Sequence, residues 1–332
     1  MNKTHLITNN LNLIYIILLN RILDMKMFKD KFKEGIISAR DFTRDDIEYI
    51  LKKAREMIRN HNKSHLLSGK ILATLFFEPS TRTRLSFESA MYRLGGNVIG
   101  FHSGDVSSIK KGESIADTIR TVENYSDGIV IRHNLEGAAI LAAKFSKVPI
   151  INAGSGSGEH PTQALLDLLT ITQEGHELDG LNIGIMGDLK YGRTVHSLAV
   201  LLSNFDANIY FISPKELMLR HRDKDLLQQK NVKYKEITQY RDILNVLDIL
   251  YMTRIQKERF ADIEEYERVK DAFVFTKEDL LETNDNFRLM HPLPRVNEIS
   301  PEIDDSEKSI YFKQTYYGIP MRMAILAELL LD

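Results

Sequence analysis

Short apolar runs alternate with helical patterns from residue 32 onward, and this alternation restricts the fold more than any other feature of the sequence. The run at 71–77 (ILATLFF) lacks the regular polar alternation of a half-exposed strand, so it predicts a strand buried on both faces. Apolar residues at helical spacing follow at 85–94, and Gly95-Gly96 ends that helix. Repeats of strand, turn and helix are typical of α/β folds with parallel sheets, which we therefore expect here.

The repeats fall into two series, and a length of 332 residues also fits two domains of roughly 100 to 200 residues each. The first series comprises expected strands at 71–77, 97–101, 128–132 and 148–153, and helices at 85–94, 114–125, 136–145 and 162–174. The second comprises strands at 181–186, 208–212 and 248–252, and helices at 194–203 and 239–247. We place the boundary at 175–180 and expect two doubly wound parallel-sheet domains joined by long helices.

The two ends of the chain stand apart from these series. Residues 1–31 form an N-terminal extension, whose unbroken apolar run at 13–19 is too short to span a membrane, since a span needs about 20 residues. Three interpretations stay open: a docked helix, the remnant of an organelle leader, or a segment preceding a chain that begins near Met25 or Met27. At the other end, a helical tail at 325–331 is expected to pack back on the first domain. Because Pro320 would break a helical hydrogen bond, we expect the regular helix after it, or a kink.

Composition excludes several classes of function. Forty-four Lys and Arg residues against 46 Asp and Glu leave a formal charge of -2, without a long block of like charge, so nucleic acid is not an expected partner. The absence of cysteine excludes disulfides, thiolate metal sites, iron–sulfur clusters and cysteine nucleophiles. A reducing compartment such as the cytoplasm fits this composition, and direction to an organelle by the N-terminal extension is the alternative.

The segment 78–84 (EPSTRTR) combines a proline turn, three hydroxyls and two arginines between a strand and a helix. Pro79 ends the strand, and Ser or Thr at the next positions are suited to cap the helix. The hydroxyls, the free N–H groups of the first turn and the positive end of the helix dipole then converge with Arg82 on one spot. Such a spot is suited to bind a phosphate. The Gly-rich pattern of nucleoside-triphosphate loops is absent.

Further polar residues follow other expected strands of the first series, at the edge where α/β folds bind ligands. Arg132 ends the strand at 128–132, and His160 and Gln163 follow the glycine-rich loop after 148–153. His160 is able to polarise a carbonyl, and Gln163, one helical turn on, is able to orient the same group. Taken singly, a structural histidine and a surface ion pair are the simpler interpretations of His160 and Arg132.

Together, these motifs indicate a protein family more specifically than any one of them does alone. FEPSTRTRLSFE (77–88), KKGES (110–114), Arg132-His133 and HPTQ (160–163) resemble, in this order, the carbamoyl-phosphate domain of the transcarbamoylases, and the resemblance extends from about residue 32 to the C-terminus. It implies that the phosphate of carbamoyl phosphate is bound by Ser80, Thr81, Arg82, Thr83 and Arg132. It also implies that Thr83, Arg132 and His160 act catalytically at the carbonyl oxygen, while Gln163 binds the carbamoyl NH2 group. Ser107 and Lys111 match the loop that enters the neighbouring subunit's site, which implies a homotrimer with shared active sites.

The second half indicates which amine is carbamoylated. Arg193 and Arg254 both follow expected strands, and two separated guanidinium groups suit a substrate with two carboxylates, such as aspartate. Ornithine carries an ammonium group and would be repelled. The resemblance agrees with aspartate: it assigns the binding of aspartate to Lys111, Arg193, Arg254, Gln256 and the backbone of Pro292 and Leu293. Ornithine enzymes carry a cysteine in the loop at 291–295, and this chain has none.

The resemblance thus implies a carbamoyl-phosphate-binding domain at 32–175, completed by the C-terminal helix at 311–332, and an aspartate-binding domain at 176–310. The expected activity is transfer of the carbamoyl group to aspartate in de novo pyrimidine biosynthesis, without a metal or other cofactor, as the two domains close on the substrates. A regulatory chain is left open as a further partner. Two alternatives remain: a non-catalytic protein of this fold used for binding or assembly, and a carbamoyltransferase for another amine such as ornithine.

Overall fold

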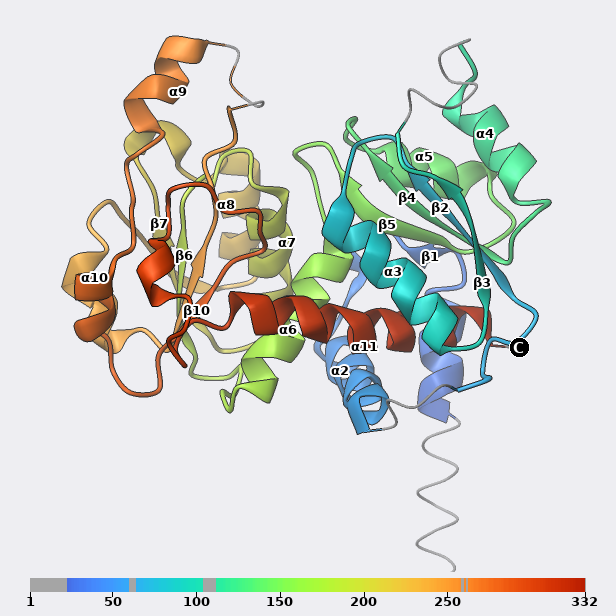
Figure 1. Ribbon diagram of the computed structural model, residues 1–332, viewed down its shortest axis with the longest axis horizontal. Coiled ribbons are helices and arrows are strands. Elements are labelled where there is room, and N and C mark those ends of the chain that lie inside the picture. Colours follow the sequence, from blue (N-terminus) through green and yellow to red (C-terminus); the bar gives the residue numbers. More distant parts are fainter. Residues whose placement is uncertain (1–22, 60–63, 104–111, 258–259, 261, 332) are drawn as a thin grey trace, which may run out of the picture.

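The computed structural model describes residues 23–59, 64–103, 112–257, 260 and 262–331. Two five-stranded sheets organise them, and Figure 1 shows the sheets side by side. The first sheet has the order β1 (Gly35–Ile36), β5 (Ile150–Ser155), β4 (Gly128–His133), β2 (Ile71–Phe76) and β3 (Asn97–Phe101). The second has the order β10 (Arg288–Met290), β9 (Ile249–Met252), β6 (Asn182–Met186), β7 (Asn208–Ile212) and β8 (Lys233–Ile237).

All neighbouring strands of both sheets are parallel, which confirms the predicted α/β class with two parallel-sheet domains. The predicted strand at 71–77 is β2, which lies between β3 and β4 and is buried at almost every position. Since parallel strands all end at one edge, the loops that carry the polar motifs gather at the carboxyl edges of the two sheets. Within the described residues, no helix is long and apolar enough to cross a membrane.

Helices cover the two sheets. Those of the first sheet are α2 (Arg44–Arg59), α3 (Thr81–Arg93), α4 (Ile115–Val122), α5 (Ala138–Phe145) and α6 (Pro161–Gln173). Those of the second are α7 (Arg193–Leu202), α8 (His221–Gln229), α9 (Ile263–Val269) and α10 (Lys277–Leu281). Helices α6 and α7 pack against each other where the two halves meet. Their buried leucines, such as Leu168 and Leu198, belong to one apolar core that extends through both halves.

The C-terminal helix differs from its predicted form. Helix α11 (Tyr311–Leu330) is a single helix of 20 residues with Pro320 inside it, so the expectation that regular helix begins only after the proline is wrong. Proline in a helix interior costs about 3 kcal/mol. Packing offsets that cost, because every residue from Met321 to Leu330 is buried. As predicted, the helix packs back on the first half of the chain, against α2, α3 and α6 (Figure 1).

A second correction concerns the expected helix at 239–247. The structure has a 3-10 helix, Arg241–Val246, in its place. The buried Tyr240 is held before it by a hydrogen bond from its hydroxyl to Asp279 Oδ2, at 2.8 Å, and β9 already starts at Ile249. Only a short connection fits between these two fixed points, and 3-10 geometry is common in such connectors.

Candidate active site

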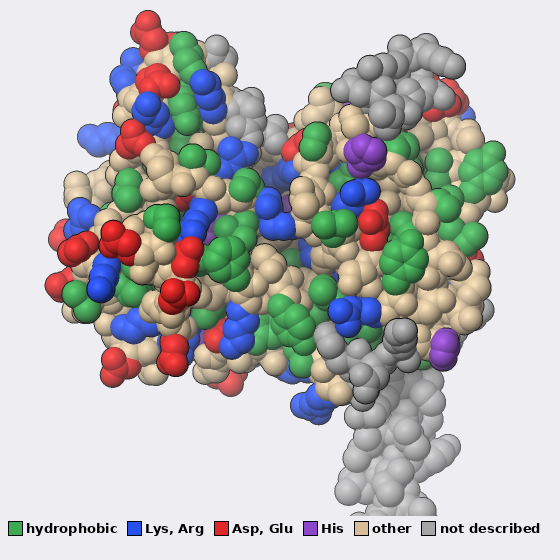
Figure 2. Space-filling view, in the orientation of Figure 1, with side chains coloured by type: hydrophobic (Ala, Val, Ile, Leu, Met, Phe, Trp, Pro, Cys, Tyr) green, Lys and Arg blue, Asp and Glu red, His purple; other side chains and the backbone are tan. Residues whose placement is uncertain are grey.

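A cavity of about 1060 Å³ opens between the carboxyl edges of the two sheets. Figure 2 shows the hollow between the two lobes, with Lys and Arg side chains in blue around it. All predicted site residues that the structure describes line this cavity: Ser80, Thr81, Arg82, Thr83, Arg132, His160, Gln163, Arg193, Arg254, Gln256, Pro292 and Leu293. Ser107 and Lys111, predicted to serve a neighbouring subunit, lie outside the described residues. The structure therefore brings together residues that are up to 213 positions apart (80 to 293).

The N-terminus of α3 forms one wall of the cavity. Ser80 occupies the N-cap position with an extended backbone, but its hydroxyl makes no capping hydrogen bond, so the expected side-chain cap is absent. The first turn also contains no acidic residue. The positive end of the helix and the hydroxyls of Ser80 and Thr81 thus border the cavity, an arrangement that favours an anion.

Glu78 joins two predicted arginines across the cavity, and this role was missed from the sequence. Its Oε1 atom accepts hydrogen bonds from Arg132 Nη2 at 2.8 Å and from Arg193 Nη2 at 3.0 Å, and its Oε2 atom accepts one from Arg193 Nη1 at 3.2 Å. Arg193 also donates to the carbonyl of Gly156 at 3.0 Å. Glu78 follows β2, whereas Arg193 begins α7, so one carboxylate spans the two halves of the chain. The sequence signal that could have indicated this role is an acidic residue at the start of an arginine-rich motif.

The side chains that line the cavity carry more positive than negative charge. Burial, reinforced by the charge of Arg193, lowers the pKa of Arg132 to about 10, which still leaves it protonated at pH 7. Burial alone would raise the pKa of Glu78, but Arg193 and Arg132 together lower it below its ordinary value. Burial also lowers the pKa of Arg82, and the charge of Arg254 from the opposite wall adds to this shift. Among the described residues that line the cavity, five arginines and one carboxylate leave net positive charge for anionic ligands.

The turn after β10 forms the opposite wall. His291 Nδ1 accepts the N–H of Leu293 at 2.8 Å, and its Nε2 atom lies 2.8 Å from Glu298 Oε1. Both ring nitrogens are thus engaged, and His291 holds the shape of the turn. Leu293 has a φ of 56°, in the left-handed region. Pro292 and Leu293 therefore line the cavity from a fixed turn.

Comparisons with known proteins identify the family. The family described as "Aspartate/ornithine carbamoyltransferase, carbamoyl-P binding domain" matches residues 35–173, and "Aspartate/ornithine carbamoyltransferase, Asp/Orn binding domain" matches residues 179–329. This chain belongs to the aspartate/ornithine carbamoyltransferase family. It is 55% identical over 294 residues to the aspartate carbamoyltransferase catalytic subunit of Thermococcus gammatolerans, covering 88% of this chain and 96% of the relative.

Solved structures of this family have the same fold. The catalytic subunit of M. jannaschii aspartate transcarbamoylase is 52% identical, covers 89% of this chain and 97% of its own, and gives a TM-score of 0.82. Aspartate transcarbamoylase from Trypanosoma cruzi in complex with N-(phosphonacetyl)-L-aspartic acid is 40% identical, covers 91% of this chain and 97% of its own, and gives a TM-score of 0.84. The carbamoyltransferase fold predicted from the sequence is thus confirmed.

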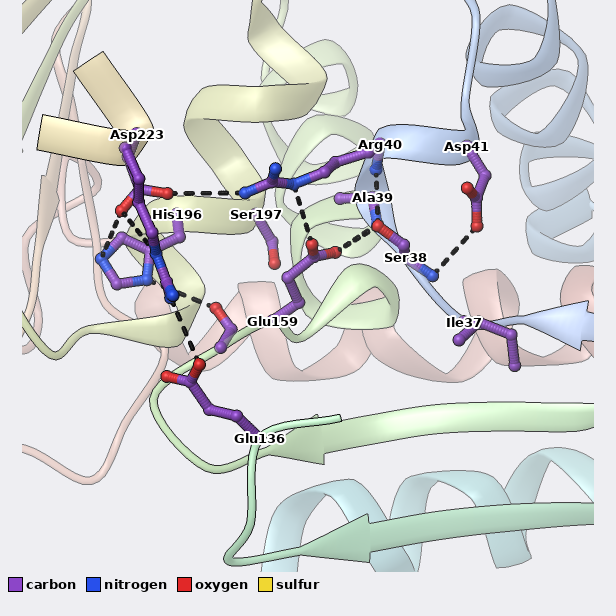
Figure 3. A network of polar contacts seen from close by, with 12 residues as sticks. Ile37, Ser38, Ala39, Arg40, Asp41, Glu136, Glu159, His196, Ser197 and Asp223 are labelled. Carbon is purple, nitrogen blue, oxygen red and sulfur yellow. Dashed lines mark hydrogen bonds and ion pairs between the residues drawn. The ribbon is translucent and has the colours of Figure 1, made fainter. Parts of the chain in front are cut away.

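A polar network outside the cavity holds the loop that precedes His160 (Figure 3). Glu159 Oε2 accepts hydrogen bonds from Ser38 Oγ at 2.8 Å and from the N–H of Ala39 at 2.6 Å, while Arg40 donates to Oε1 at 3.2 Å. On the other side, the N–H of His160 donates to Ser197 Oγ of α7 at 2.8 Å. The loop is therefore fixed from both halves of the chain.

His160 is neutral in this environment. Its side chain is buried, and burial together with the charges of Arg193 and Arg132 holds its pKa well below the ordinary value. Its Nδ1 atom has no hydrogen-bond partner among the described residues. A neutral imidazole beside two guanidinium groups is able to donate one hydrogen bond to an oxygen without adding a further full charge.

The neutral state of His160 predicts a pH effect on stability. Below a pH of about 6.5 the unfolded chain binds a proton at this residue, whereas the folded chain does not, so folding becomes less favourable as pH falls. Relative to His160→Gln, the wild type should lose up to about 1.4 kcal/mol of unfolding free energy per pH unit below that point, and nothing above it. Denaturant unfolding of both proteins between about pH 5 and pH 8 measures this. A difference that does not change with pH would contradict the neutral state.

Removing the charge of Glu78 should destabilise the empty enzyme. Glu78→Gln leaves Arg132 and Arg193 without their shared carboxylate. We expect the free energy of unfolding to fall by about 1 to 3 kcal/mol, and inorganic phosphate to restore more stability in the variant than in the wild type. Thermal melts with and without phosphate measure both effects.

Glu48→Gln is the matched control for this change. It breaks a pair with Arg44 of similar length, 2.7 Å, but this pair lies exposed on α2. Its loss should cost at most about 0.5 kcal/mol. Equal melting temperatures for the wild type and Glu78→Gln, in the absence of phosphate, would show that Glu78 does not offset the arginine charges.

Proposed function

We propose that this chain is the catalytic subunit of an aspartate carbamoyltransferase, which transfers the carbamoyl group of carbamoyl phosphate to L-aspartate in de novo pyrimidine biosynthesis. The products are N-carbamoyl-L-aspartate and phosphate. One observation carries the proposal: the N-terminus of α3, which is suited to bind a phosphate, lines the same cavity as Arg193 and Arg254. The complex of the Trypanosoma cruzi relative with N-(phosphonacetyl)-L-aspartic acid supports it, because that molecule carries both kinds of anionic group.

The reaction needs positioning and charge stabilisation. The uncharged α-amine of aspartate attacks the carbonyl carbon, a carbon–nitrogen bond forms, and the bond from that carbon to the phosphate oxygen breaks. We assign the phosphate to Ser80, Thr81, Arg82, Thr83 and Arg132, the oxyanion to Thr83, Arg132 and His160, and the carbamoyl NH2 group to Gln163. The amine proton is taken up by the departing phosphate. Holding two anionic substrates together and offsetting the developing negative charge are the two largest catalytic effects available to such a site.

Aspartate is assigned to Arg193, Arg254 and Gln256, with the carbonyls of Pro292 and Leu293 receiving its amine. Two guanidinium groups match two carboxylates. Turnover assays with carbamoyl phosphate and either aspartate or ornithine test this assignment. Product from aspartate alone is expected. Product from ornithine would agree with the assigned phosphate site but would refute the two-arginine clamp. No product from either amine would favour the non-catalytic alternative.

We further propose that the enzyme is a homotrimer whose sites are shared, with Ser107 and Lys111 supplied by the neighbouring subunit and Lys111 also reaching aspartate. The name "catalytic subunit" of the relatives fits a chain that works in an assembly. We retain the division into domains at 32–175 with 311–332, and at 176–310, and the closure of these domains on the substrates. The cytoplasm is retained as the location, and the organelle alternative gains no support from the family match, which begins at residue 35.

Shared sites predict complementation between inactive variants. Lys111→Ala and Arg132→Ala should each lose most of their activity, Arg132→Ala the more, because each removes a charged partner of the phosphate. Mixed and reassembled, they should regain activity, because some sites then receive Arg132 from one subunit and Lys111 from another. Activity of the mixture after dissociation and reassociation is the measurement. A mixture no more active than its components, or a fully active monomer in light scattering, would refute shared sites.

A further inference from the structure

Asp167 is a buried carboxylate that lies behind the cavity and has no role in the mechanism above. It is located on α6, one helical turn after Gln163, and is fully buried. Its Oδ1 atom accepts hydrogen bonds from Gln163 Nε2 at 2.9 Å and from Gln314 Nε2 at 2.6 Å. Its Oδ2 atom accepts one from the Tyr251 hydroxyl at 2.9 Å. A carboxylate in such a position is costly unless it is fully hydrogen-bonded, as it is here.

The three donors come from three different elements, and two of them line the cavity. Gln163 lines the cavity on the carbamoyl side. Gln314, on α11, also lines the cavity, and its Oε1 atom accepts the N–H of His291 at 2.9 Å, at the start of the turn that presents Pro292 and Leu293. Tyr251, on β9, stands three positions before Arg254. One carboxylate thus contacts segments from both walls.

The chemistry of the contact determines how the two side-chain amides are oriented. A side-chain amide has a donor end and an acceptor end, and its direction follows from its partners. Because Asp167 Oδ1 accepts, both Gln163 and Gln314 must turn their NH2 groups toward it. The oxygen of Gln163 is then left for an N–H donor, as the NH2 of a carbamoyl group requires, and the oxygen of Gln314 receives His291. A reversed Gln314 would place an NH2 group against the N–H of His291.

We propose that Asp167 is a positioning residue that orients the Gln163 and Gln314 amides, and thereby sets the carbamoyl subsite and the 291–295 turn together. The inference rests on the proposed function. Burial raises the pKa of Asp167 to about 7, yet Oδ1 is able to accept both amides whether or not Oδ2 carries a proton. The function therefore requires an acceptor at Oδ1 rather than a full negative charge.

A pair of substitutions separates this role from packing. Asp167→Leu keeps the volume roughly unchanged and removes the acceptor. It leaves three buried donors without that partner, so its stability is measured separately by thermal melting. We expect kcat/KM for both carbamoyl phosphate and aspartate to fall by about 5- to 150-fold, with a folded protein. Asp167→Asn keeps an oxygen at Oδ1, and its NH2 group is able to donate to the Tyr251 hydroxyl. It should stay within about threefold of the wild type.

Gln314→Met tests the contact between Asp167 and Gln314 alone, and it remains informative if Asp167→Leu does not fold. It should raise KM for aspartate about tenfold, through the turn at 291–295, and leave KM for carbamoyl phosphate within about twofold. A variant that merely loosened the fold would change both constants together.

The outcomes distinguish this inference from the proposed function. Wild-type turnover with aspartate is measured first, and its absence would refute the proposed function alone. With an active wild type, the inference is overturned if Asp167→Leu folds and keeps both specificity constants within twofold. It is also overturned if Asp167→Asn and Asp167→Leu are equally impaired, or if Gln314→Met leaves KM for aspartate unchanged.

Discussion

Arg132→Ala should lower kcat/KM by about 10²- to 10⁴-fold, the largest effect that we expect from any single substitution. Arg132 is assigned to two groups, the phosphate and the developing oxyanion, and charged hydrogen bonds contribute about 1.5 to 3 kcal/mol each. Its removal also leaves Glu78 with one guanidinium partner in place of two. Because the oxyanion forms during the reaction, kcat should fall together with kcat/KM. Steady-state kinetics with both substrates varied measure the effect.

Arg84→Ala is the matched control. Arg84 belongs to the same EPSTRTR segment, but it pairs with Glu88 at 3.5 Å and does not line the cavity. Its activity should stay within about twofold of the wild type. If Arg132→Ala and Arg84→Ala behaved alike, whether both active or both inactive, the cavity would not distinguish the two arginines and the site assignment would be wrong.

Arg254→Ala should lower kcat/KM for aspartate by about 10- to 150-fold, because it removes a charged partner of one substrate carboxylate. Arg254 lines the wall formed by the second sheet, so the loss should appear mainly as a higher KM for aspartate. Binding of inorganic phosphate should be retained.

Lys257→Ala controls for the loss of a positive charge in the same segment. Lys257 lies three positions after Arg254, and it is exposed and absent from the cavity lining. We expect aspartate KM within about twofold of the wild type. Calorimetric titration with phosphate and kinetic titration with aspartate separate the two subsites. An aspartate KM unaffected by Arg254→Ala would refute the two-arginine clamp.

Strands buried on both faces were predictable from the sequence because their apolar runs are continuous. The strand expected at 208–212 has the same bounds as β7, and 71–77 differs from β2 by one residue. The edge strand β8 (Lys233–Ile237) was missed, since its residues KYKEI are only half-buried and carry three charges. An edge strand pairs with a neighbouring strand on one side only and is more exposed to water. Its sequence therefore contains no continuous apolar run by which it could be recognised.

The predicted cavity residues share one property: each belongs to a motif that follows a strand. Glu78 and Asp167 could not be assigned in this way, because their roles depend on partners 115 and 147 positions away, Arg193 and Gln314. Asp167 did leave a trace, a single carboxylate within the apolar run ALLDLLTI. Such a residue predicts a buried partner, but only the packing of α11 on α6 identifies it.

Helix α11 has a consequence for how the chain is made. Residues 311–330 follow both sheets in the sequence, yet they fill the apolar surface between α2, α3 and α6, which are synthesised earlier. The early half therefore keeps an open hydrophobic groove throughout translation, while the strands of the second sheet are already available to pair. The first half of the chain is thus completed only after the second sheet has been synthesised. A nascent chain halted before residue 311 would present that groove to chaperones, and the final helix would end this exposure.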